Sequence, residues 1–174
     1  MCGRSQQIDI YKILQKGQVF DFNNIEYWYN NIPTNGIYLM MEKTENNRVS
    51  RIGINKRRNL KNRLLKHSNG SIRNSIFRKH LYRILKSEDK VSEYVKESVR
   101  FFVINDPDNR REDIEKKLIS YFSNIPLKNI SNNWLGLIGD NKKISSSGLW
   151  NVQHVFSKCE VSLEDLRYIK ENLI

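Results

Sequence analysis

The fold is decided by residues 36–67, whose sequence is GIYLMMEKTENNRVSRIGINKRRNLKNRLLKH. A polar, asparagine-rich turn at 44–47 separates an apolar run, Gly36 to Met41, from a second run, Val49 to Gly53, and this pattern predicts a β-hairpin. Leucines four residues apart indicate a helix face over 60–67. The stretch therefore predicts two paired strands followed by a basic helix.

The expected register brings a phenol and a guanidinium to one face of this hairpin. With a turn of four residues, Lys43 faces Arg48. The same register places Met40 opposite Arg51, and because side chains alternate along a strand, Tyr38 lies on that face, diagonal to Arg51. A free tyrosine has a pKa of about 10 and is a weak base at neutral pH, but a fixed positive charge nearby favours the phenolate. Most strand tyrosines only pack, so base chemistry at this pair is a hypothesis.

The basic helix carries two side chains suited to an anion site. Arg63 and His67 lie four residues apart and project from one helix face. Arg63 sits beside the leucine stripe, near the hairpin, where its guanidinium could bind a phosphate through two parallel hydrogen bonds as no lysine can. Arg57 and Arg58, which precede the helix, are predicted to contact a phosphate backbone outside the centre.

The elements after this helix are predicted from their periodicity. A second helix from Ile72 to Leu85 would bury Ile76. Its polar side comprises Arg73, Arg78, Lys79 and Arg83. The apolar run 99–104 predicts a central strand covered on both faces. The next helix buries an apolar stripe and carries Glu115 at its margin, where an isolated glutamate is usually solvated surface. Ser162 starts a final helix with a capping signal.

The positive charge of the chain is concentrated in one segment. The formal net charge is +11 and the pI is about 9.7, which points to nucleic acid, a membrane surface or an acidic protein as partner. Residues 48–86 hold thirteen of the 30 Lys and Arg residues and none of the 19 Asp and Glu residues. Most charge runs are only solvated surface, but a patch of this kind favours phosphate binding.

Cysteine, histidine and hydropathy patterns narrow the class of protein. Cys2 and Cys159 make no disulfide framework or zinc spacing, and the three histidines show no two-histidine metal motif. No apolar run approaches the roughly 20 residues of a membrane span, and the first residues lack a signal-peptide core. A length of 174 residues suits one domain. We therefore expect a single cytoplasmic domain.

Two segments leave alternatives open. The aromatic residues between 19 and 32 either cover one edge of the core, which we favour, or form a flap that stacks on exposed bases. In the last third of the chain, Trp134 and Trp150 are expected to pin loop-like segments to the body of the protein; the alternative is that Trp150, Asn151 and His154 contact base edges.

Together these motifs resemble the core of the GIY-YIG nucleases, a small α/β module that cuts DNA phosphodiesters. The resemblance rests, in chain order, on Gly36-Ile37-Tyr38, Arg51-Ile52-Gly53, Arg63-x-x-x-His67 and the Glu115 helix. It implies an α/β (α+β) fold with a three-stranded antiparallel sheet flanked by helices.

The resemblance also divides the chain. The nuclease core would span 36–133. Residues 1–35 would form an N-terminal extension packed on that core, and residues 134–174 a C-terminal loop and helix extension. All three parts would belong to one globular domain.

The family assigns a role to each matched side chain. Tyr38 takes the place of the tyrosine proposed as general base for the attacking water, and Arg63 that of the arginine that holds the scissile phosphate. His67 matches a polar position near the tyrosines. Glu115 matches the only acidic side chain expected on the divalent ion, Mg²⁺, with Mn²⁺ as an expected substitute. One carboxylate leaves the ion several waters, which suits Mg²⁺ better than zinc.

The remaining site residues are assigned less directly. The late asparagine that braces the site in the family could be Asn129, Asn132 or Asn133, which the motif does not separate; Asn132 is taken as the candidate. The residues predicted to contact DNA are Arg57, Arg58, Lys61, Lys66, Arg73, Arg78 and Lys79.

The chain departs from the family pattern at Arg51, where the family name has a tyrosine. Arginine stays protonated and cannot act as a base, so a proton relay through this position is not expected. Some restriction-enzyme members resemble this chain in having a lysine there. We therefore hypothesise that Arg51 favours the phenolate of Tyr38 electrostatically.

The function implied by the resemblance is a Mg²⁺-dependent DNA endonuclease of restriction or defence type. No separate recognition domain is visible, so specificity would come from the flanks, and a homodimer could cut both strands. Two alternatives remain: a non-cleaving DNA-binding protein on a decayed nuclease fold, and an RNA-processing nuclease.

Overall fold

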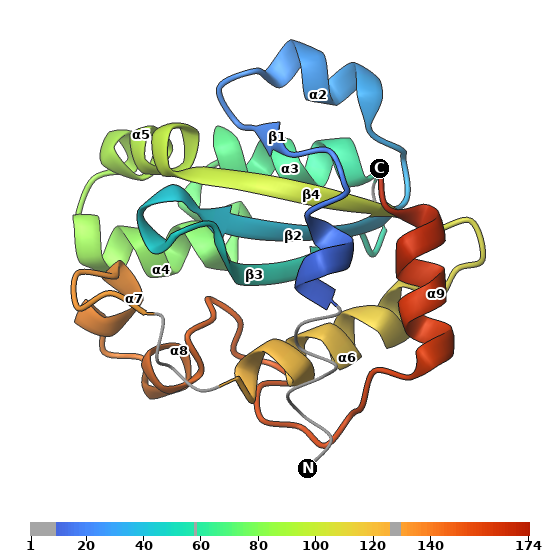
Figure 1. Ribbon diagram of the computed structural model, residues 1–174. Helices are drawn as coiled ribbons and strands as arrows, with labels where there is room; N and C mark the ends of the chain where they lie inside the picture. The colour runs from blue at the N-terminus through green and yellow to red at the C-terminus, as the bar shows by residue number, and fades with distance from the viewer. Residues whose placement is uncertain (1–9, 58, 126–129) are drawn as a thin grey trace.

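The fold is built on a four-stranded antiparallel sheet of order β1-β4-β2-β3 (Figure 1). The computed structural model describes residues 10–57, 59–125 and 130–174. The strands are β1 (Phe20–Asp21), β2 (Gly36–Glu42), β3 (Arg48–Ile54) and β4 (Val99–Asn105). The predicted α+β fold is confirmed, and the expected three strands are β4, β2 and β3. The short β1, which the sequence did not predict, adds a fourth strand at the outer edge of β4.

The turn between β2 and β3 owes its shape to asparagine. A short 3₁₀ helix, η1 (Lys43–Glu45), leads out of β2. Asn46 and Asn47 follow it with φ of 53° and 56°. Asparagine tolerates this left-handed region better than most residues, because its short polar side chain forms local hydrogen bonds.

The register of the hairpin is as predicted on one side of a bulge and shifted on the other. Met40 faces Arg51, as expected. Ser50 then drops out of the pairing, so that Arg48 faces Glu42. The predicted partner of Arg48, one residue further along, is therefore wrong, because the bulge places one extra residue on β3.

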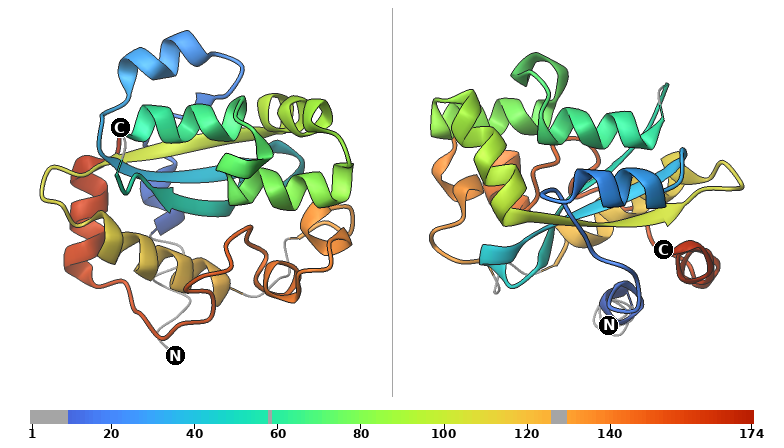
Figure 2. Two further views of the ribbon diagram at one scale, coloured as in Figure 1. Left: turned by 180° about the vertical axis from the view of Figure 1, so that it is seen from behind. Right: turned by 90° about the horizontal axis from the view of Figure 1, so that it is seen from above.

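Helices cover both faces of the sheet (Figures 1 and 2). The face that carries Tyr38 and Met40 packs on α3, α4 and α5, and the other face packs on α6, α9 and the helical residues 10–14. The helices are α2 (Ile25–Asn31), α3 (Leu60–Ser68), η2 (Ile72–Asn74), α4 (Ile76–Leu85), α5 (Glu88–Ser98), α6 (Arg111–Ser123), α7 (Leu135–Ile138), α8 (Lys142–Ser147) and α9 (Leu163–Asn172). Among the described elements none is long and apolar enough to cross a membrane.

The aromatic residues near the start of the chain belong to the core, as favoured from the sequence. Phe20, Phe22 and Trp28 are fully buried, and their rings surround Phe101 of β4. Tyr27 remains about half exposed, at 47%. The alternative of a base-stacking flap therefore has little support, because most of its rings are inaccessible.

The predicted helix from Ile72 to Leu85 is broken at Ser75. Its first turn is the separate helix η2, and α4 begins only at Ile76, with Ser75 as N-cap. The later start shifts the buried face. Ile76, predicted to be buried, is 52% exposed, and Phe77 and Leu81 pack inward instead.

Arg78 was assigned to the polar, DNA-binding side of this helix, and that prediction is wrong. The residue is only 1% exposed. Its guanidinium donates to the carbonyls of His67 and Ser68 at 3.1 and 2.9 Å and to Ser92 Oγ at 2.8 Å. Arg78 therefore joins α3, α4 and α5 inside the protein, and its buried guanidinium is not available to bind DNA.

Glu42 anchors the C-terminal third of the chain to β2. Its fully buried carboxylate accepts the Nε1–H of Trp134 at 2.8 Å and that of Trp150 at 3.2 Å, and it also accepts the hydroxyl of Tyr94. The prediction that the tryptophans pin their loops to the body is thereby confirmed. The segment around residue 150 is held against the sheet from within.

Asp106, directly after β4, joins α6 and α9 to the end of the sheet. Its Oδ1 accepts from Tyr168 Oη and from the backbone N–H of Arg110, both at 2.7 Å, and its Oδ2 pairs with Arg111 Nη1 at 3.0 Å. Burial alone would raise the pKa of this carboxyl, but the hydrogen bonds from these three residues outweigh it and lower the pKa below 3.8.

Asp106→Asn should therefore destabilise the protein at pH 7 by about 1–3 kcal/mol, because charge-assisted partners lose their acceptor. A carboxyl with a lowered pKa contributes stability above its unfolded pKa and loses it as pH falls. The difference in melting temperature from the wild type should shrink below about pH 4. Thermal unfolding across pH 3–7 measures this, with the exposed Asp140→Asn as control. An equal difference at every pH would contradict the assignment.

Candidate active site

A cleft at the outer edge of β3 collects side chains that lie far apart in the sequence. Its volume is about 590 Å³. Tyr38 and Arg51 reach it from the hairpin, Arg63 from α3 and Glu115 from α6. Four of the residues assigned from the sequence are thus brought together around one space. A fifth, His67, lies behind Tyr38, outside the lining of the cleft.

Tyr38 is held by a buried chain of hydrogen bonds. Its Oη lies 2.8 Å from His67 Nε2, and His67 Nδ1 lies 2.8 Å from Ser75 Oγ. Tyr38 and His67 have no exposed surface, and Ser75 is 1% exposed. Tyr38 forms part of the cleft wall, so a water reaches its oxygen only after a neighbouring side chain moves.

His67 is uncharged in this setting. Burial lowers its pKa well below 6.5, and the positive charges of Arg51, Arg63 and Arg78 lower it further. A neutral imidazole has one N–H and one free nitrogen, so it donates one hydrogen bond and accepts another. The hydrogen bonds to Tyr38 and Ser75 use both ring nitrogens.

Arg51 is fixed in the wall of the cleft. It is 7% exposed, its Nη1 donates to the carbonyl of Trp150 at 3.3 Å, and its guanidinium carbon lies 5.5 Å from the centre of the Phe77 ring. A cation over an aromatic face is stabilised electrostatically. Its place on the face of Tyr38, predicted from the register, is confirmed by the pairing of Met40 with Arg51.

Arg63 lines the cleft, and the described residues leave its guanidinium donors free. Within the described part of the chain no hydrogen bond or ion pair engages this side chain, although its charge lowers the pKa values of both His67 and Glu115. Arg63 therefore lies within electrostatic range of both His67 and Glu115. A planar guanidinium with free donors suits a phosphate.

Glu115 meets the cleft as a partly buried carboxyl. Burial raises its pKa to about 7, although the charges of Arg51, Lys56 and Arg63 act in the opposite direction. Among the described residues no group of three His, Cys, Asp or Glu side chains could hold a metal ion. The donor set is thus one carboxylate with room for water, which fits Mg²⁺ and does not fit zinc.

Asn151, which the sequence assignment did not include, ties the loop around residue 150 to β3 at the cleft. Its Oδ1 accepts the N–H of Ile52 at 3.0 Å and its Nδ2 donates to the carbonyl of Ile52 at 2.8 Å. The neighbouring Trp150 N–H donates to the carbonyl of the bulged Ser50 at 2.7 Å. These bonds fix the outer edge of β3 beside Arg51. Only the tertiary contact with Ile52 reveals the role of Asn151, because no local sequence motif marks this residue.

The structure places Asn132, the predicted bracing residue, outside this cleft. Asn132 and Asn133 are exposed and absent from the lining of the cleft. They precede α7, on the side where Ser131 bonds to Glu45. Asn129 lies outside the described residues.

The predicted DNA-contacting residues divide by position. Arg57 and Lys66 line the cleft, as does Lys56, which was not predicted. Lys61 places its ammonium over the Tyr29 ring at 5.2 Å. Arg73 and Lys79 are exposed and do not line the cleft. Arg78 is buried, and Arg58 lies outside the described residues. The exposed His154 also lines the cleft, and so does Trp150, whose buried ring leaves no exposed surface for a base edge.

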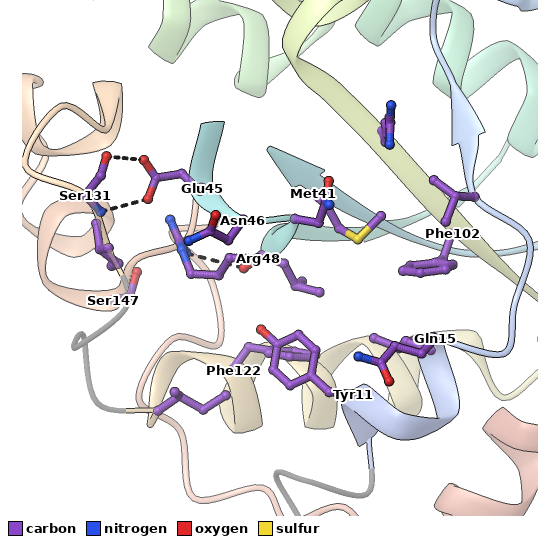
Figure 3. A pocket seen from close by; sticks show the side chains of 17 residues that line it. Tyr11, Gln15, Met41, Glu45, Asn46, Arg48, Phe102, Phe122, Ser131 and Ser147 are labelled. Carbon is purple, nitrogen blue, oxygen red and sulfur yellow. Dashed lines mark hydrogen bonds between the residues drawn. The ribbon is translucent and has the colours of Figure 1, made fainter. Parts of the chain in front are cut away.

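A larger cavity of about 930 Å³ lies between the β2–β3 turn, residues 10–14 and the end of α6 (Figure 3). Each of its charged side chains, Glu45, Arg48 and Arg100, makes at least one hydrogen bond or ion pair within the protein. The Glu45 carboxylate accepts from the N–H and hydroxyl of Ser131, and Arg48 Nη1 donates to the carbonyls of Val49 and Gly148. The smaller cleft, where Arg63 has free donors, is therefore the candidate site.

Gly53 determines where the Tyr38 ring can lie. The two residues are opposite each other on β2 and β3, and the ring crosses the glycine so closely that a Cβ would overlap Oη and Cζ. Any larger residue at position 53 would displace the ring and break its hydrogen bond to His67.

Gly53→Ala should therefore lower the free energy of unfolding by about 1–3 kcal/mol, because a buried ring has to move. Differential scanning calorimetry measures this loss. The matched control is Gly139→Ala, whose Cβ would meet Ile84 Cδ1 at an ordinary 3.4 Å. If both variants melt at the wild-type temperature, the contact does not constrain Tyr38.

Comparison with known proteins identifies a family. The family model for the GIY-YIG domain matches residues 83–172, which is more than half of the 174 residues. The matched residues include β4, α6 with Glu115, and the loop with Trp150 and Asn151, but not the hairpin that carries Tyr38. No curated protein and no solved structure matches the chain.

Proposed function

The chain belongs to the GIY-YIG domain family, and on this premise we propose that it is a Mg²⁺-dependent DNA endonuclease. One observation carries the proposal: Tyr38, Arg63 and Glu115 meet in a single cleft. They supply a base, a phosphate clamp and a metal ligand, the three parts that hydrolysis of a phosphodiester needs.

The reaction is a displacement at phosphorus. A water attacks the scissile phosphate and loses one proton to the phenolate of Tyr38. The bond between phosphorus and the 3′ oxygen breaks, and that oxygen takes up a proton from solvent. Arg63 neutralises the charge that grows on the non-bridging oxygens. The products are a 5′ phosphate and a 3′ hydroxyl.

Glu115 is the ligand proposed for the divalent ion. Lewis-acid stabilisation of the leaving 3′ oxygen is the chemistry that a bound Mg²⁺ supplies. A carboxyl whose pKa burial raises to about 7 gains much from a cation that favours its ionised form. Mn²⁺ binds similar oxygen ligands and should substitute.

The charge around the cleft supports DNA as the substrate. Lys56, Arg57 and Lys66 line it beside Arg63, and Glu115 is the one acidic residue of the lining that the structure describes. Phosphates bound there would release counterions, so binding should weaken as salt rises. A restriction or defence role is part of the proposal, in which a homodimer would place one such cleft on each strand of a duplex.

The alternative is a DNA-binding protein that does not cut. Two observations favour it: Tyr38 has no exposed surface, and a cation, Arg51, stands where the family has a second tyrosine. In this alternative the cleft binds a phosphate but never exposes the phenol to water.

Supercoiled plasmid with Mg²⁺, with Mn²⁺ and with EDTA separates the two functions. Cleavage should require the ion, and Glu115→Ala, Tyr38→Phe and Arg63→Lys should each lower the rate by about 10²- to 10⁴-fold. Asn132→Ala, exposed and outside the cleft, is the matched control. Plasmid that is shifted in a gel but stays uncut with either metal would establish the binding function instead.

The positive charge of Arg51 should contribute to the cleavage rate. Arg51→Gln is expected to lower the cleavage rate at pH 7, because the phenolate loses a neighbouring cation. Arg51→Lys, which keeps the charge, should restore much of the rate. An Arg51→Gln variant that cleaves as fast as the wild type would refute this role.

A further inference from the structure

The exposed side chains in the wall of the cleft are of three chemical kinds. Among the described lining residues, the exposed ones are Lys56, Arg57, Ile76, Gln153 and His154. The two cations suit phosphates, which carry no sequence information, and the isoleucine offers only apolar surface. Gln153 and His154 are consecutive, and they carry an amide and an imidazole, groups that both donate and accept hydrogen bonds.

The polar groups of this pair are unused inside the protein. Within the described part of the chain, no hydrogen bond or ion pair engages the side chain of Gln153 or His154. The backbone carbonyl of His154 accepts the N–H of Ser157 at 3.3 Å, and this bond leaves the imidazole free. Exposed polar side chains are common on any protein surface, so free groups alone assign no role. What sets the pair apart is the fixed backbone that carries it.

The loop that carries the pair is held at both ends. Before it, the side chain of Asn151 makes two hydrogen bonds to the backbone of Ile52 in β3, at 3.0 and 2.8 Å. After it, the N–H of Phe156 donates to Ser123 Oγ at 2.8 Å, and the carbonyl of Ser157 accepts from a second serine of α6. The loop therefore spans from β3 to α6, two of the elements that build the cleft, and its position in the cleft wall is fixed by them.

The backbone of this loop adopts an unfavourable conformation at two residues. His154 and Phe156 have φ of 61° and 58°. The other described non-glycine residues with positive φ are three asparagines and the C-cap of α4. A bulky residue such as phenylalanine is rarely found in this left-handed region, because its Cβ crowds the backbone. Such strain persists only where the surrounding bonds enforce it, and it is concentrated at functional sites.

We infer that the loop 152–157 determines sequence specificity, with Gln153 and His154 contacting base edges beside the scissile phosphate. The inference rests on the proposed function, because it needs DNA in the cleft. A phosphate held by Arg63 brings its own nucleotides to the side chains that line the same cleft. An amide can bind the N6 and N7 of adenine together, and an imidazole can donate to or accept from a base edge. A loop that is already rigid makes such contacts with little further loss of entropy.

One double variant and two controls test the inference. The double variant Gln153→Ala/His154→Ala removes both proposed base contacts, and it should melt like the wild type because both side chains are exposed. Asn132→Ala removes an exposed amide outside the cleft. Arg57→Ala removes an exposed cation of the lining and so tests a phosphate contact instead of a base contact.

The first measurement is cleavage of a duplex library with a randomised block in the presence of Mg²⁺, followed by sequencing of the cut ends. The wild type should prefer particular bases beside the cut, and the double variant should still cut but lose at least about fivefold of that preference at one or more positions. Arg57→Ala should cut all sequences more slowly with the same preference, and Asn132→Ala should match the wild type. A wild type without base preference, or a double variant with the wild-type preference, would overturn the inference.

The second measurement separates this inference from the proposed function. Duplexes that bind the Glu115→Ala protein in EDTA are selected from the same library and sequenced, with and without the double substitution. The bound sequences should show the same loss of preference as the cut ends. If the wild type binds DNA but never cuts it, the proposed endonuclease activity fails, and the bound sequences alone decide whether the loop contacts bases. If it binds no duplex, DNA is not the substrate, and the inference is overturned as well.

Discussion

The contact between the Tyr38 ring and Gly53 is the constraint on which the site depends. A ring can lie flat across β3 only where the opposing residue has no side chain. That placement brings Oη to His67 and leaves the next position on the same face, Met40, opposite Arg51. The hairpin thus sets the spacing of phenol and guanidinium, and the packing of α3 on this face brings the imidazole of His67 to the phenol.

Local patterns in the sequence were enough to predict the strand and the helix that hold Tyr38, Arg63 and His67. The leucine spacing of α3 placed Arg63 and His67 on one helix face, and the alternation along β2 placed Tyr38 on the face of Arg51. Each of these inferences uses residues a few positions apart. Periodicity is a strong signal at that range.

The parts that could not be predicted depend on distant residues. The bulge at Ser50 is stabilised by Trp150, about a hundred positions away, and Asn151 binds Ile52 across a similar separation. Arg78 was predicted to be exposed because an arginine is rarely buried. Its burial is paid for by carbonyls at the end of α3 that only the packed structure offers.

The covered edge of β3 limits how two copies could associate. Trp150 and Asn151 already bond to Ser50 and Ile52, so those backbone groups are unavailable to a strand from another molecule. A continuous sheet across two copies through this part of β3 is thereby ruled out. Two clefts acting on opposite strands of one duplex would have to be aligned by side-chain contacts elsewhere or by the DNA itself.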